Sequence, residues 1–182
     1  MDKKTTLEMI AAISNANGTS GFEDEVVAAI RPYAEGLGEI TEDRMRNLYI
    51  RRKENNGKRP VVQLDAHSDE VGFMVQAICP NGTLRIIQVG GWVNHNIPAH
   101  KVLVRNRFGE YILVQDAVRS AGSTNGAAIH LTEKAVPVIV IGVPVRYAHT
   151  HYGISAYSDF DNAVKLACEI LKRLDEEQVM SF

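Results

Sequence analysis

Two apolar runs, each followed by histidine and other polar residues, constrain the fold of this chain more than any other feature. Residues 60–66 lead directly into His67, and residues 135–145 form a nearly unbroken run rich in Val and Ile that leads into residues 146–151. The second run is typical of a strand that is covered on both faces, as in parallel sheets. Because α/β folds place chemistry where buried strands end, we expect functional side chains after both runs.

Helical patterns lie near both ends of the chain. Apolar residues at near-helical spacing predict a short first helix over residues 7–13. The S-x-x-E pattern of residues 20–23 predicts a capping box, in which the Ser and Glu side chains satisfy free backbone N–H groups at the start of a second helix. A third helix is expected over residues 159–174, with an aspartate as its cap and one apolar stripe.

Short strands separated by turn signals predict an antiparallel β subdomain between these parts. Residues 80–82 read Pro-Asn-Gly, a hairpin signal, and further short strands follow up to residue 114. We therefore predict an α/β fold with a mainly parallel core sheet flanked by helices, into which a small antiparallel β subdomain is inserted. The α/β domain of catalytic type would comprise residues 1–71 and 115–182, and the β subdomain residues 72–114.

Composition excludes several classes of protein. The chain has 20 Lys+Arg against 22 Asp+Glu and a formal charge of −2, which gives no electrostatic case for binding nucleic acid or an anionic membrane. Cys79 and Cys168 are too few and too far apart for a disulfide framework or a thiolate zinc site, so a reducing compartment is expected. No signal-peptide pattern and no run of about 18 apolar residues occurs, which predicts a cytoplasmic protein.

Two histidines are placed where a metal site could form. His67 follows the first apolar run and His149 follows the second, so neighbouring parallel strands would bring both imidazoles to one rim of the sheet. Strand alternation puts Asp65, His67 and Asp69 on one face. Asp69 would then either hold the imidazole of His67 or contact a metal itself.

The spacing of these residues also fits readings without a metal. A His-x-Asp pair is common, and it often serves in capping or in a surface ion pair. His151 is either a further ligand or an exposed neighbour of His149. The remaining three histidines are expected to be satisfied or exposed: His95, His100 and His130. Neither a phosphate loop nor a nucleophile elbow occurs in the chain.

Five short motifs, in order along the chain, carry a resemblance to one family. They are residues 18–23, 67–73, 90–92, 123–127 and 143–149. Together they resemble the dinuclear-metal aminopeptidases that assemble as tetrahedral particles, which include glutamyl and deblocking aminopeptidases, some once labelled endoglucanases. The His-x-Asp-Glu-x-Gly-Phe and Arg-Tyr-x-His pieces are specific in combination, and the matching stretches cover nearly the whole chain.

The resemblance implies an activity and roles for three residues. The activity is metal-dependent removal of N-terminal residues from peptides, in which a glutamate deprotonates a metal-bound water. By the same resemblance His67 is a metal ligand, His149 is the terminal ligand of the second metal, and Asp69 is the catalytic carboxylate that orients His67. The implied cofactor is a divalent metal, zinc or else cobalt or manganese, with two ions per site in the family. Peptides are the expected substrate and further copies of the chain the expected partners.

The chain departs from the family pattern by a missing internal block. The family's bridging aspartate, its Glu-Glu pair and a further aspartate ligand would fall where this chain passes from Tyr111 to Asp116, and none of them is found. Two imidazoles leave a zinc ion short of the three or four ligands that it needs, unless others contribute. The candidates for that role are Asp65, Asp69, Glu70, Asp116 and His151. We therefore expect one metal or none, and an incomplete β subdomain.

The chain also departs from the family pattern at two single positions. Arg46 stands where the family usually has Gly, and His151 where it usually has Pro.

The apolar run over residues 135–145 would lack the neighbours that the missing block supplies, and an uncovered face favours association. The chain is therefore either an enzyme of this family or a non-catalytic remnant that acts as a scaffold or assembly partner. A block removed by design or by an error in the gene model is the third reading.

Overall fold

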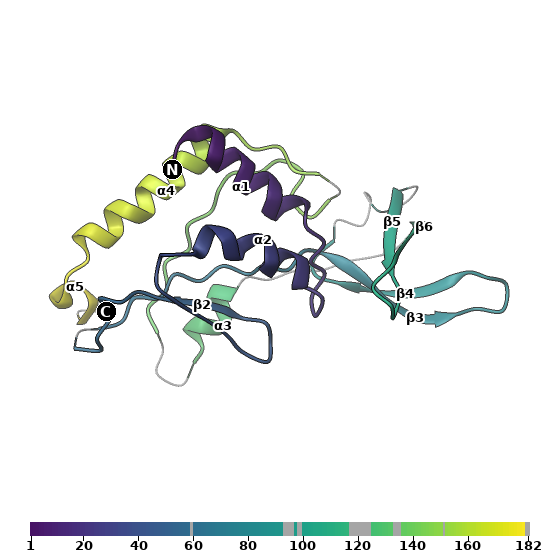
Figure 1. The fold of residues 1–182 in the computed structure, drawn as a ribbon, viewed down its shortest axis with the longest axis horizontal. Coiled ribbons are helices and arrows are strands. Elements are labelled where there is room, and N and C mark those ends of the chain that lie inside the picture. The colour runs from purple at the N-terminus through teal and green to yellow at the C-terminus, as the bar shows by residue number, and fades with distance from the viewer. Residues whose placement is uncertain are drawn as a thin grey trace. The chain divides into compact units, whose positions relative to one another are not determined.

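The computed structural model describes residues 1–58, 60–92, 97, 100–116, 125–132, 136–150 and 152–180 (Figure 1). The chain divides into two compact units. Unit 1 comprises Met1–Glu70, Asn125–Pro144 and Ala156–Phe182, and unit 2 comprises Val71–Thr124 and Val145–Ser155. Each unit is described by itself below.

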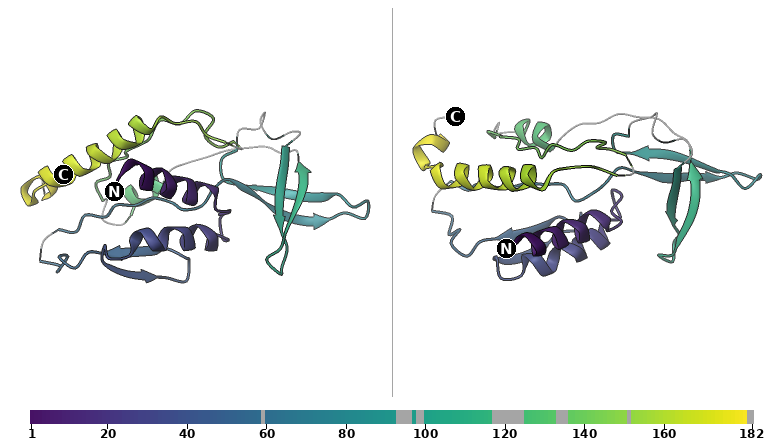
Figure 2. Two further views of the ribbon diagram at one scale, coloured as in Figure 1. Left: turned by 45° about the horizontal axis from the view of Figure 1, so that its top comes forward. Right: turned by 90° about the horizontal axis from the view of Figure 1, so that it is seen from above.

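Unit 1 contains the five helices of the described chain, α1 (Lys3–Asn15), α2 (Asp24–Ala34), α3 (Asn125–His130), α4 (Tyr157–Arg173) and α5 (Glu176–Met180). These helices confirm the three predicted from the sequence and add the short α3 and α5. α1 packs alongside α2, as Figure 2 shows, and α2 supplies the buried side chains Val26, Val27 and Ala34. Within the described residues, no helix is both long and apolar enough to cross a bilayer.

The predicted helix caps are wrong. α2 begins at Asp24 after Glu23, which makes no side-chain cap, and Glu23 Oε1 accepts a hydrogen bond from Gly21 N at 2.6 Å. Ser20 lies outside the cap position and its hydroxyl donates to Asp69, so the expected capping box does not form. The start of α4 likewise has no side-chain cap, because Ala156 occupies the cap position.

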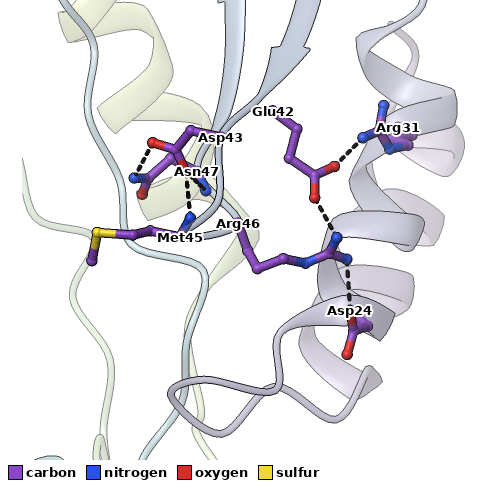
Figure 3. Close-up of polar contacts among 7 residues, drawn as sticks. All are labelled: Asp24, Arg31, Glu42, Asp43, Met45, Arg46 and Asn47. Atoms are coloured by element: carbon purple, nitrogen blue, oxygen red, sulfur yellow. Dashed lines mark hydrogen bonds and ion pairs between the residues drawn. The ribbon is translucent and has the colours of Figure 1, made fainter.

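Strands β1 (Glu39–Glu42) and β2 (Leu48–Arg51) form an antiparallel hairpin in unit 1 that is fastened to α2 by charged side chains. Glu42 of β1 pairs with Arg31 of α2 and with Arg46 of the turn, while Arg46 Nη2 lies 2.7 Å from Asp24 Oδ1 (Figure 3). Arg46 has a φ of 69°, in the left-handed region that favours glycine. This backbone explains why glycine suits the position, and the ion pairs show what arginine adds there.

Unit 2 contains two antiparallel hairpins, which confirm the antiparallel pairings expected for this part of the chain. β3 (Gly72–Ile78) pairs with β4 (Leu84–Val89), with a register shift between Val75 and Ala77, and β5 (His100–Arg105) pairs with β6 (Tyr111–Asp116). In the first turn Cys79 N donates to Thr83 O at 2.8 Å, and Gly82 has a φ of 82°. The Pro-Asn-Gly signal is thus confirmed as a tight turn.

Trp92 anchors the end of the first hairpin. Its indole Nε1 donates to Gly72 O at 3.0 Å, and its ring stacks on Phe73 with centroids 4.7 Å apart. Gly90, with a φ of 81°, turns the chain so closely that an added Cβ would lie 2.9 Å from Val71 Cγ1. The motif over residues 90–92 therefore serves to bury Trp92 against the start of β3.

The parallel core sheet predicted from the two apolar runs does not form among the described residues. The three sheets in the described part of the chain are all two-stranded and antiparallel, and neither residues 60–69 nor residues 136–145 belong to a strand there. Large apolar side chains of the two runs are exposed: Val61, Val62, Leu64, Val136, Ile139, Val140 and Ile141. A parallel strand needs hydrogen-bonding neighbours from elsewhere in the chain, whereas a hairpin strand finds its neighbour across a short turn. The observed fold is mixed helix and strand with small antiparallel sheets.

Candidate functional site

His67 and Asp69, predicted as neighbours on one strand face, are in direct contact in unit 1. His67 Nδ1 lies 3.0 Å from Asp69 Oδ1 and 2.9 Å from Asp69 O. Both of these oxygens accept hydrogen bonds, so Nδ1 carries the proton in this arrangement. The other ring nitrogen, Nε2, then presents its lone pair, as in histidines that bind metals while a carboxylate holds the opposite nitrogen.

Asp69 is itself held from its other side by Ser20. The Ser20 hydroxyl donates a hydrogen bond to Asp69 Oδ2, the oxygen that does not face His67. Next to this contact Glu70 N donates to Gly18 O at 2.7 Å, and Gly18 N donates to Glu70 Oε1 at 3.1 Å. The motif over residues 18–23 is thus fastened to the motif that contains His67.

Gly18 is required by the closeness of this contact. A Cβ added at this position would lie 2.4 Å from Val26 Cγ2 and 3.4 Å from Ser68 O. Any side chain would therefore separate the loop from α2 or from residues 67–70. Ser20 and Asp69 are 49 residues apart in the sequence. Because Gly18 has no side chain, the segments that carry them come within hydrogen-bonding distance.

A cavity of about 350 Å³ borders His67 in unit 1. Its walls come from the end of α1, from α2 and from residues 66–70, and they are largely apolar: Ile13, Ala16, Val26, Ile30 and Ala66. His67 and Glu70 supply polar groups to the same lining. His67 therefore borders a space whose walls are largely apolar.

Asp65, one of the candidate additional ligands, lies on the same segment and already has a partner. Its Oδ2 accepts a hydrogen bond from Asn125 Nδ2 at 3.1 Å. Asn125 begins α3 and belongs to the motif over residues 123–127. A third motif is thereby connected to the segment that carries His67.

His149 lies in unit 2, on a short loop with an unusual backbone. Arg146 and Ile154 close the loop through two backbone hydrogen bonds of 2.9 and 3.0 Å. The single proton of the Thr150 hydroxyl lies between two acceptors, with Thr150 Oγ1 2.7 Å from Tyr147 O and 3.0 Å from Tyr152 O. Tyr147 and His149 have φ angles of 61° and 58°. Such strained conformations persist where surrounding contacts enforce them, and they cluster at functional sites.

The described residues do not complete a metal centre. No group of three or more His, Cys, Asp or Glu side chains that could hold an ion occurs among them. His67 fits one ligand position, because its Nε2 is presented and its Nδ1 is held, but a catalytic zinc ion needs about three protein ligands. His95 and His151 lie outside the described residues, as do the side chains of His100 and Asp116.

Sequence reasoning found His67 and Asp69 but missed Ser20. The S-x-x-E pattern directed Ser20 to a helix cap, whereas the structure gives its hydroxyl to Asp69. The only available signal was that residues 18–23 and 67–73 both belong to the set of motifs shared with one family. His130, predicted to be satisfied or exposed, is exposed, with its Nδ1 lying 3.3 Å from Val136 O.

The sequence matches the family model described as M42 glutamyl aminopeptidase over residues 47–115 and 110–166. These two segments together span more than half of the chain, and the chain belongs to this family. The family is metal-dependent. The two matches meet at residues 110–115, the stretch where the sequence places the missing block.

Individual relatives agree with the family assignment. The chain is 35% identical over 133 residues to a putative aminopeptidase, FrvX, of Escherichia coli, covering 70% of this chain and 33% of that protein. It is 30% identical over 108 residues to a glutamyl aminopeptidase of Lactococcus lactis, covering 59% of this chain and 30% of that protein.

A solved structure shares part of the fold. The TET aminopeptidase of a marine sediment Thaumarchaeota archaeon matches with a TM-score of 0.55 and 32% identity, covering 60% of this chain and 30% of that one. The chain thus spans about a third of the length of each of these relatives.

Proposed function

We propose that this protein is a metal-dependent aminopeptidase that releases N-terminal residues from peptides. The proposal assigns residues 1–71 and 115–182 to the catalytic-type domain and residues 72–114 to a truncated β subdomain. It gives His67 and His149 the role of metal ligands and Asp69 the role of orienting His67. Zinc is the proposed ion, with cobalt and manganese as alternatives, and the cytoplasm is the proposed compartment.

The contact between His67 and Asp69 is the observation that carries this proposal. Asp69 Oδ1 lies 3.0 Å from His67 Nδ1, so Nε2 is the ring nitrogen left to bind a metal, in a family whose members use metals. A carboxylate on the far nitrogen is the usual support of a metal-binding histidine. The further ligands would come from residues outside the described ranges or from another chain, and we propose a homo-oligomer for this reason.

A hydrolysis assay with added metal tests the activity. The purified protein would be incubated with peptides that begin with Glu, Lys or Leu, in the presence of zinc, cobalt or manganese. We expect release of the N-terminal residue, reduced at least about 100-fold by His67→Ala because a ligand position is lost. His130→Ala is the matched control, since it removes an exposed imidazole of α3. Release that is absent, or equal in both variants, contradicts the proposal.

The second candidate function is a non-catalytic remnant that serves as a scaffold or assembly partner. The exposed apolar side chains of residues 60–66 and 136–141 favour it, because uncovered Val and Ile side chains promote association. Under this reading the two runs would form their parallel sheet only when a partner supplies neighbouring strands. Sizing by light scattering, together with metal analysis of the purified protein, separates the candidates: a remnant associates without bound metal or hydrolysis.

A further inference from the structure

We propose that Ser20 is a positioning residue, whose hydroxyl fixes the Asp69 carboxylate and thereby the orientation and tautomer of His67. The catalytic meaning of this role rests on the proposed function. The contacts themselves do not, because they are internal to unit 1.

The two oxygens of the Asp69 carboxylate are held from opposite sides. Oδ1 lies 3.0 Å from His67 Nδ1, and Oδ2 accepts the hydrogen bond from Ser20 Oγ. A carboxylate with one hydrogen bond can rotate about its Cβ–Cγ bond, because that torsion has a broad minimum. The second bond removes this freedom, so Oδ1 stays directed at the imidazole.

Ser20 lies in a loop that is held to residue 70 by backbone contacts. Thr19 forms a parallel bridge with Glu70, and Phe22 N donates to Thr19 O at 2.8 Å to close a turn around Ser20. Gly21 takes the left-handed conformation that this turn requires, with a φ of 88°. Because the loop is bonded to residue 70 and Asp69 is its neighbour, Ser20 and Asp69 are held in a fixed relation.

The alternative use of Ser20 as a helix cap does not account for the geometry. α2 begins at Asp24, so Glu23 and not Ser20 occupies its N-cap position. A cap would use only the lone pairs of the Ser20 hydroxyl, whereas the observed bond uses its proton, which Ser20 donates to the carboxylate that orients His67. Its hydrogen bond therefore acts on the candidate site.

The tautomer of His67 measures this role directly. The ¹⁵N chemical shifts of the two ring nitrogens would be recorded by NMR at pH 8.5 in the whole chain, with His67→Ala identifying the signals. We expect the form protonated on Nδ1 to dominate in the unmodified protein. Ser20→Ala should lower the ratio of Nδ1-protonated to Nε2-protonated imidazole about fivefold, the effect of losing one hydrogen bond of ordinary net strength.

Conservative variants separate positioning from folding. Ser20→Thr keeps the hydroxyl and should keep the ratio, whereas Ser20→Cys keeps the size but weakens the donor, and should lower the ratio part of the way. Ser158→Ala, at an exposed serine of α4, is the control and should change nothing. If Ser20→Ala does not fold, the comparison of Ser20→Thr with Ser20→Cys decides the question.

The results overturn one proposal without touching the other. A ratio that is equal in Ser20→Cys, Ser20→Thr and the unmodified protein overturns the role of Ser20, whether or not the protein hydrolyses peptides. A ratio of Nδ1-protonated to Nε2-protonated imidazole that falls in Ser20→Ala and stays unchanged in Ser20→Thr supports the role of Ser20. This holds even if the hydrolysis assay detects no activity. In that case only the proposal that the protein is an aminopeptidase is overturned.

Discussion

The hairpins of unit 2 and the two apolar runs have similar sequences but different structures. β3 to β6 and residues 60–66 and 136–145 are all rich in Val, Ile and Leu. The hairpin strands pair across turns of a few residues, as between β3 and β4, while the two runs belong to no strand in the described chain. The comparison teaches that strand-forming residues are not sufficient. A parallel strand also needs a neighbour brought by a crossover, and the described residues supply none to either run.

Burial follows the same division. Trp92, which closes the first hairpin, is 7% exposed, and Val27 of α2 is 2% exposed. Ile139 and Val140, in the longer run, are each 67% exposed. Apolar residues therefore stabilise the chain where local elements cover them, and they contribute little in the two runs.

The largest expected effect is the loss of unfolding free energy on replacing Trp92, compared with replacing an exposed aromatic residue. Trp92→Ala removes the stacking on Phe73 and the bond to Gly72 O, and it should lower the free energy of unfolding by about 3–5 kcal/mol. Phe108→Ala, at a side chain 72% exposed, should change it by less than about 0.5 kcal/mol. Urea denaturation followed by circular dichroism measures both. Equal effects would show that the hairpin does not depend on Trp92.

Two glycines provide the next test. Gly18→Ala places a Cβ 2.4 Å from Val26 Cγ2 and should cost about 1–3 kcal/mol through overpacking. Gly142, in the longer apolar run, has no atom within 4 Å of an added Cβ, so Gly142→Ala should be neutral or slightly stabilising. Thermal unfolding of the two variants compares them. A loss for Gly142→Ala as large as for Gly18→Ala would mean that this run is packed.

One buried and one exposed valine allow the two regions to be compared with the same substitution. Val27→Ala removes buried methyl groups from α2 and should cost about 1.5 kcal/mol, whereas Val140→Ala should cost less than about 0.5 kcal/mol. Denaturation at low and high protein concentration is the measurement. A cost for Val140→Ala that appears only at high concentration would show that a second copy covers the run.

The smallest expected effect concerns pH and the β1–β2 turn. The side-chain hydrogen bond from Asn47 chiefly, with backbone N–H groups of Asn47 and Met45, lowers the pKa of Asp43 below its ordinary value of 3.8. The stabilisation is therefore complete above pH 3.8, and it is lost as the pH falls through the lowered pKa of the folded state. Asp43→Asn should remove this acid-dependent part, which unfolding measured between pH 2 and 6 would reveal. A difference between variant and parent that is constant over this range contradicts the prediction.

Local features of the fold were predictable from the sequence. Helical spacing located α1, α2 and α4, and the Pro-Asn-Gly signal located the β3–β4 turn, because these patterns depend on residues close in the chain. The short strand β1 gave no signal, since it is held by pairing with β2 and by the ion pairs of Glu42. The predicted caps were wrong because Glu23 and Ala156 occupy the N-cap positions of α2 and α4.

The candidate site was predictable in part. The alternation of residues 65, 67 and 69 predicted the contact of His67 with Asp69, which the structure contains. Ser20 was not predictable, because a bond across 49 residues leaves no periodic pattern. The joint action of His67 and His149 stays a prediction, since the two residues belong to different units.

Backbone amide hydrogen exchange tests the central contrast most directly. Amides of β3 to β6 that lie in the hydrogen-bonded ladders should exchange at least about 100-fold more slowly than those of residues 61–66 and 138–143, because opening a paired strand costs free energy. Mass spectrometry of peptides from the whole chain resolves these segments. Slow exchange in the hairpins with fast exchange in both runs is the predicted result. Protection of the two runs equal to that of β3 would contradict the account, because it would show that these strands have found neighbours.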